Sequence, residues 1–238
     1  MKPSRLFLFL VNNVLSFSLK RYFFRRCLRI LQTSSLQIVI IAIVSGSLIT
    51  YLSFILSARN PFGISIQQFL PFLFSSLIIE EICPFIAFFT VLGQCCISTG
   101  MELHSCSRRG ELEILYVYKI NPVGIYLSPF IISSMLLGVL GCGCFIIASF
   151  TVIFWMVYVN EPGYFSVNAG KYLGILQIKP MALVFLKTIL FAMFSSLTAA
   201  YYATSNFTKM EKFKVSNVIA ISTLLSRATD FLFYLFRN

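Results

Sequence analysis

Long apolar runs separated by short polar segments make up most of this chain and predict helices that cross a membrane. A helix needs about 20 mainly apolar residues to cross the hydrocarbon core of a bilayer. Four runs reach this length, and they cover residues 36–57, 130–159, 181–204 and 215–236. The pattern therefore predicts an all-α membrane protein.

A fifth apolar region covers residues 62–99, about twice the length of one span, and Glu80 and Glu81 interrupt it near its middle. It can form two spans with a turn at the glutamates. It can also form one long span over residues 81–99, preceded by a re-entrant or interfacial segment that starts near Pro61. Inner loops of membrane proteins carry an excess of Lys and Arg. Five spans place thirteen of the nineteen Lys and Arg residues on the inner side, against ten for six spans, so we predict five transmembrane helices.

The start of the chain is basic and partly apolar. Although its first residues resemble a signal peptide, no A-x-A-like cleavage site follows, and Asn12 and Asn13 interrupt the apolar stretch. We therefore expect residues 1–35 to be a retained amphipathic helix on the inner membrane face, and residues 36–238 to be the transmembrane region of a single domain, residues 1–238. Seven basic residues support this interpretation: Lys2, Arg5, Lys20, Arg21, Arg25, Arg26 and Arg29.

The composition agrees with a lipid environment. Only 11% of the 238 residues are charged, against about 25% in a typical soluble domain, while 58% are hydrophobic. These values exclude a soluble enzyme, a disordered chain and a disulfide scaffold. The net charge of +11 fits an anionic membrane surface better than nucleic acid in so apolar a chain, and no nucleic-acid partner is expected.

Residues for catalysis or for binding a metal or cofactor are not recognisable. The chain has no G-x-x-x-x-G-K-[ST] phosphate loop, no H-E-x-x-H and no G-x-S-x-G, so we predict no enzyme activity, and ATP would have to be bound by a partner. The single histidine, His104, is expected to be solvated in a polar loop. The seven cysteines show no C-x-x-C spacing and lie mostly in apolar runs, so we interpret them as small hydrophobic residues.

Three charged residues lie inside predicted spans, where a charge costs about 2.5–3.5 kcal/mol at the bilayer centre. Lys187 is near the outer end of its span and can extend its amine outwards. Arg227 and Asp230 are three residues apart and can neutralise each other on one helix face, or serve a proton relay. The role of these charges stays open.

A polar segment between two predicted spans, residues 101–119, has an amphipathic pattern. Leu103 can face one way, and Glu102, Arg109 and Glu113 the other. Asn121-Pro122 should end this helix, because proline lacks the backbone donor and restricts the residue before it. Such a helix on the inner face can be pushed by an ATPase, or it can be a simple surface loop.

A series of motifs runs through this region without a gap. It begins with Glu81-Ile-Cys-Pro84 and Gly93, and it closes with Asn121-Pro122 and Ser128-Pro129. The series resembles the permease of the MlaE type, the membrane subunit of ABC systems that work with MCE-domain proteins, whose motif reads E-L-G-P, then Gly, and closes with V-[DN]-P and S-P-R. The resemblance implies structural roles for Glu81, Pro84, Gly93 and Pro129.

The inner loop carries the rest of the resemblance. Glu102-Leu103-His104 is similar to the family's E-I-G, and residues 109–115 are similar to its T-E-Q-x-x-x-[LM] segment. The resemblance implies that an ATPase-coupling loop contains Glu102, Glu111, Glu113, Asn121 and Pro122. The chain departs from the family's residues at Cys83, Gln94, His104 and Gly110.

The resemblance implies a permease that pairs with itself, binds a separate ABC ATPase through the inner loop, and contacts an MCE-domain lipid-binding protein on the other side. Together they would move phospholipid between membranes. A non-transporting membrane scaffold and an ion-coupled carrier are the alternatives, and five spans without an inverted repeat disfavour the carrier. The chain has 26 Phe but only 12 Gly, a bias of AT-rich coding that favours a plastid (chloroplast) inner envelope membrane over a bacterial inner membrane.

Overall fold

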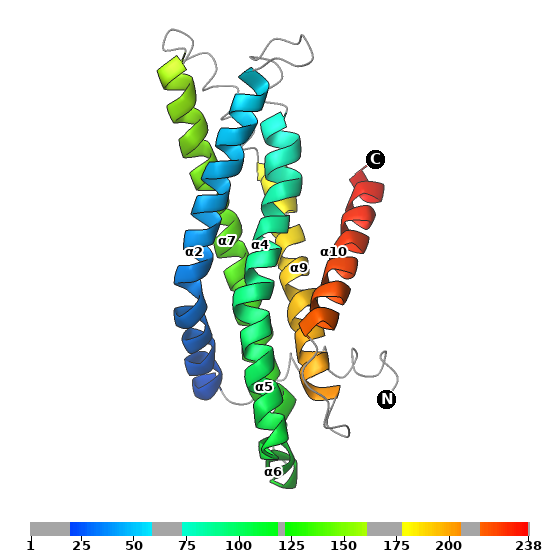
Figure 1. Ribbon diagram of the computed structural model, residues 1–238. Helices are drawn as coiled ribbons and strands as arrows, with labels where there is room; N and C mark the ends of the chain where they lie inside the picture. The colour runs from blue at the N-terminus through cyan, green and yellow to red at the C-terminus, as the bar shows by residue number, and fades with distance from the viewer. Residues whose placement is uncertain (1–19, 59–72, 119–121, 161–177, 206–214, 238) are drawn as a thin grey trace. The chain divides into compact units, whose positions relative to one another are not determined.

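The computed structural model describes residues 20–58, 73–118, 122–160, 178–205 and 215–237, and these residues are helical apart from the turn between α5 and α6 and the turn residue Tyr118 after α6 (Figure 1). The all-α prediction is confirmed for this part of the chain. The long helices are α2 (Lys20–Ala58), α7 (Pro122–Asn160), α9 (Ile178–Ser205), α10 (Val215–Arg237) and a composite helix that begins at Leu73.

Four of the helices that the structure describes are long and apolar enough to cross a membrane. Their apolar parts are Phe23–Leu56, Leu77–Arg108, Tyr126–Met156 and Met181–Ala203. The predicted fifth span, residues 215–236, forms helix α10 but is not among these four. Arg227 and Asp230 lie within it and lower its mean hydropathy.

The composite helix passes straight through Glu80 and Glu81. It consists of η1 (Leu73–Ile82), α4 (Cys83–Val91), η2 (Leu92–Ile97) and α5 (Ser98–Arg108), with the two η segments wound as wider π-helix. The alternative of two spans with a turn at the glutamates is therefore wrong. Residues 81–99 form one helix as the other alternative predicted, but this helix begins earlier, at Leu73, and the predicted re-entrant or interfacial segment before residue 73 lies outside the described residues. Glu81 pairs with Lys187 from another helix, as described below.

The predicted boundary at residue 35, between an interfacial helix and the first span, falls inside one continuous helix. Residues 20–35 of the expected interfacial segment form the start of α2, which runs to Ala58 without a break near residue 35. The earlier part of that segment, residues 1–19, lies outside the described residues.

The chain divides into two compact units, which we describe separately. The second unit comprises residues 36–90 and 138–190. Its core contains residues from α2, η1, α4, α7 and α9: Ala42, Ile78, Ile79, Cys83, Ala87, Cys142, Phe145, Ile146, Phe150, Ile153 and Val184.

Helix α2 enters this core through a single row of side chains. Ile38, Ala42, Gly46 and Thr50 are spaced four residues apart and are all buried. Gly46 lies so close to α7 that a Cβ atom there would be 2.8 Å from the carbonyl oxygen of Phe145. Small residues at such a row let two helix backbones approach closely, which is the usual basis of helix packing in lipid.

The first unit comprises residues 1–35, 91–137 and 191–238. Small polar residues on α9 and α10 form part of its interior. The hydroxyls of Thr198 on α9 and Ser222 on α10 are 2.6 Å apart and buried. Ser226 lies one turn after Ser222 and is also buried. Hydroxyl pairing therefore joins these two helices.

Many hydroxyl side chains in the helices bond to the backbone of their own helix. Ser45 Oγ donates to the carbonyl of Ile41 at 2.7 Å, and Thr151 Oγ1 donates to the carbonyl of Ile147 at 2.8 Å. Thr188 Oγ1 makes the same kind of bond inside the second unit. These bonds satisfy the hydroxyl donor without a partner from another helix.

Candidate functional site

The polar segment after the second apolar span folds as two helices rather than the one predicted over residues 101–119. Helix α5 ends at Arg108, and α6 (Glu111–Val117) begins two residues after Arg109 (Figure 1). Gly110 connects them with a backbone φ of 73°, the left-handed conformation in which glycine commonly ends a helix. We refer to residues 98–117 as the α5–α6 element.

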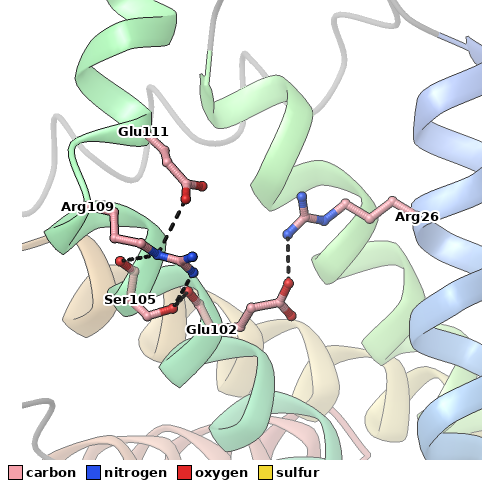
Figure 2. Close-up of polar contacts among 5 residues, drawn as sticks. All are labelled: Arg26, Glu102, Ser105, Arg109 and Glu111. Carbon is pink, nitrogen blue, oxygen red and sulfur yellow. Dashed lines mark hydrogen bonds and ion pairs between the residues drawn. The ribbon is translucent and has the colours of Figure 1, made fainter.

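The turn is held by Arg109, whose guanidinium bridges its two sides. Its Nε lies 3.4 Å from Glu111 Oε1, and its Nη2 donates to Ser105 Oγ at 3.3 Å (Figure 2). Because both members of the ion pair are substantially exposed, it contributes little to stability. The direction in which α6 leaves α5 is set by the left-handed backbone of Gly110, which the Arg109 side chain bridges.

The element presents a mixed charged and apolar surface. Glu102, Arg109 and Glu113 are exposed, and Leu103 is buried, as the amphipathic pattern predicted. Ile114 and Val117 on α6 are exposed as well. The described surface of the element therefore combines exposed charges with two exposed apolar side chains.

A second arginine connects this element to two other helices of the same unit. Arg26 on α2 points toward Glu102 on α5, with Nη2 3.7 Å from Oε1 (Figure 2). The same guanidinium lies over the ring of Tyr126 on α7, 4.1 Å from its centroid, within the range of a cation–π contact. Sequence patterns do not reveal this pairing, because Arg26 is one of seven basic residues in a segment expected to face lipid headgroups.

Asn121 and Pro122 were predicted to end the inner helix. Asn121 lies outside the described residues, and Pro122 is the first residue of α7. Proline is favoured at the first position of a helix, because its missing N–H has no partner there in any case. Pro129 is buried one to two turns further on, and the carbonyl of Pro129 accepts a hydrogen bond from Ser133 Oγ.

The histidine of this region is not the solvated loop residue that was expected. His104 lies on α5 and is half-buried, and its Nδ1 is 3.4 Å from the carbonyl oxygen of Ala203 on α9. The polar segment is helical here rather than a loop, and His104 contacts the neighbouring helix α9.

The other family-motif positions lie along the composite helix. Pro84 is buried, while Gly93 is exposed, and a Cβ atom at Gly93 would meet no described atom within 4 Å. Packing within the described residues therefore supports a structural role for Pro84, but it gives no reason for a glycine at position 93.

Glu81 has a partner that the sequence could not reveal. Lys187 on α9 does not extend outwards as expected. Its side chain is 8% exposed, and its Nζ donates to Glu81 Oε2 at 3.2 Å and to the carbonyl oxygen of Glu80 at 3.3 Å. The two charges lie 106 residues apart in the chain, and their pairing neutralises a cation inside a predicted span.

The remaining intramembrane charges lie on α10. Arg227 is exposed and Asp230 is half-buried. Their mutual ion pair stays a prediction.

The cysteines are free thiols, and six of the seven are buried. The sulfur atoms of Cys83 and Cys142 lie 3.2 Å apart in the core of the second unit. This agrees with their interpretation as small buried residues.

Together these observations define a class of protein: an integral membrane protein of apolar helices with an exposed, charged helical element after its second span. Comparison with known families then identifies the group within that class. Residues 23–226 match the family described as Permease MlaE, and the chain therefore belongs to the MlaE permease family. Its members are permease subunits of ABC transporters for phospholipid, so this chain is a transporter subunit and not an enzyme. A search of curated proteins finds no match to the chain.

Proposed function

We propose that the chain is a half-permease that pairs with a second copy of itself and binds a separate ATP-hydrolysing subunit through the α5–α6 element. The observation that carries the proposal is the construction of that element. Gly110 adopts the left-handed conformation that turns α6 away from α5, Arg109 bridges the two sides of this turn, and the surface of the element is charged and partly apolar. A helix–turn–helix of this kind gives a partner a defined surface against which it can push.

The same proposal assigns the sides of the membrane. The α5–α6 element would lie on the inner side with the basic N-terminal segment, and α10 would serve as a fifth span. An MCE-domain lipid-binding protein would bind on the opposite side, and phospholipid would pass through an apolar cavity between two copies. The composition supports a plastid inner envelope membrane as the location, with a bacterial inner membrane as the alternative.

Co-purification tests the proposal. A tagged chain, extracted in mild detergent, should bring down an ATPase with a phosphate-binding loop. Charge reversal at Glu113, which is exposed on the element, should weaken this association or lower the ATP turnover of the complex. The matched control is Glu161→Lys, the same charge change outside the element.

The outcome separates the proposed coupling role from the alternatives. If no ATPase is recovered with the wild-type chain, the coupling role is wrong. If the ATPase binds and the complex hydrolyses ATP but moves no fluorescent phospholipid between vesicles, the scaffold alternative is supported instead.

A further inference from the structure

Arg26 differs from the other arginines of the basic segment that the structure describes. Arg25 and Arg29 are exposed, as expected for side chains that meet lipid headgroups. The side chain of Arg26 is only 15% exposed and is directed into the first unit. Arg25 and Arg29 are therefore better placed to bind lipid headgroups than Arg26 is.

The contacts of Arg26 use both parts of the guanidinium group. One edge faces the carboxylate of Glu102 on α5, and the flat face covers the ring of Tyr126 on α7. Arginine can make these two contacts together because its guanidinium is planar and rigid. A single side chain of α2 thus joins the α5–α6 element to the start of α7.

The energetics of this link argue for positioning rather than for stability. The Glu102 side chain is 61% exposed and the separation of 3.7 Å is long for a direct hydrogen bond, so water screens the pair. At this pair, α2, a helix long and apolar enough to cross a membrane, contacts the element that would receive the ATPase.

We propose that Arg26 is a positioning residue that ties the α5–α6 element to helix α2, so that movement of the element is passed to the first membrane span. The role rests on the proposed function, because the movement would come from the bound ATPase. Glu102 is its charge partner and Tyr126 is the platform that orients it.

Hydrogen exchange on the purified permease in lipid nanodiscs tests the positioning without any ATPase. Arg26→Ala should speed exchange in residues 98–117 by up to about fivefold, since the lost contacts are partly exposed. Arg25→Ala is the matched control, because it removes the same charge from an exposed neighbour on the same helix. Equal exchange in these two variants overturns the proposal.

Coupled activity provides the second measurement. In the complex with its ATPase, Arg26→Ala should lower phospholipid-transfer turnover about fivefold to tenfold, a typical allosteric coupling, while the amount of bound ATPase stays unchanged. Tyr126→Phe keeps the ring and should retain wild-type turnover, whereas Tyr126→Leu should reduce it. Unchanged turnover for Arg26→Ala overturns the proposal and leaves the proposed function intact.

A charge exchange distinguishes a specific pair from general disruption. Arg26→Glu and Glu102→Arg should each impair turnover, and the double variant should recover at least part of it. If both single changes impair turnover and the double change recovers none, the assignment of Glu102 as the partner is wrong. If the wild-type chain recruits no ATPase, the proposed function fails, and the exchange measurement still decides the positioning role.

Discussion

Gly46 on α2 gives the sharpest test of how the second unit packs. Replacing it with alanine adds a methyl group 2.8 Å from the carbonyl oxygen of Phe145, and 3.3 Å from its Cα and its Cδ2 atoms. The carbonyl oxygen and the Cα atom of Phe145 belong to the backbone, so a side-chain rotation of Phe145 cannot relieve the contact. Helices α2 and α7 must instead separate locally, which also stretches the hydrogen bond of 3.4 Å from Ser149 Oγ to the carbonyl of Gly46.

The magnitude follows from two opposed terms. Overpacking of a close contact costs about 1–3 kcal/mol, while exchange of glycine for alanine inside a helix gains about 1 kcal/mol. Gly46→Ala should therefore be destabilising by up to about 2 kcal/mol, which corresponds to a Tm up to about 8 °C lower for a chain of this size, while a helical Gly→Ala exchange without the close contact gains about 1 kcal/mol.

Thermal unfolding of the purified chain in one detergent measures the effect. Gly143→Ala on α7 is the matched control, because a Cβ atom there meets no described atom within 4 Å, and it should leave Tm unchanged or raise it. Phe145→Leu should not rescue Gly46→Ala, since the nearest atom is the Phe145 carbonyl oxygen. Equal melting temperatures for Gly46→Ala and Gly143→Ala would refute the close helix approach.

Three further predictions concern the polar contacts. Glu81→Ala should lower the free energy of unfolding more than Lys187→Met does, by about 1–2 kcal/mol. Glu81→Ala leaves a buried ammonium without its carboxylate, whereas Lys187→Met leaves a mostly exposed carboxylate. Thermal unfolding that ranks the two variants the other way would contradict the pairing. Gly110→Ala should speed hydrogen exchange in α6 about fivefold, from a left-handed penalty of about 1 kcal/mol, and Gly110→Asn less so; equal exchange in both variants would argue against the left-handed turn. A double-mutant cycle of Thr198→Val and Ser222→Ala should give a coupling of about 0.6 kcal/mol, a typical value for a side-chain hydrogen bond between membrane helices. A coupling of zero would exclude the bond between α9 and α10.

Helix positions followed from the sequence where apolar length alone decides them. The runs over residues 36–57, 130–159 and 181–204 became parts of α2, α7 and α9, because lipid leaves the backbone of such a run little choice but helix. The Glu80–Glu81 interruption was ambiguous, since a charge pair in an apolar run signals either a turn or a partner elsewhere.

The site was predicted less completely, for physical reasons that differ by residue. The amphipathic pattern of residues 101–119 continues across Gly110, so periodicity alone could not detect the turn, although glycine after two arginines is a possible helix end. The contacts of Arg26 with Glu102 and of Lys187 with Glu81 join residues far apart in the chain, and only packing brings them together.

Serine and threonine hydroxyls that bond to the backbone of their own helix present less polar surface to lipid. Ser45 and Thr151 return their donor to a carbonyl one turn back, so the bilayer meets mainly the carbon atoms of these side chains. Exchange between serine and alanine at such positions is then nearly neutral for membrane insertion, and serine can accumulate along these helices without loss of the spans. Serine content is for that reason a poor guide to which faces of the permease line a polar path.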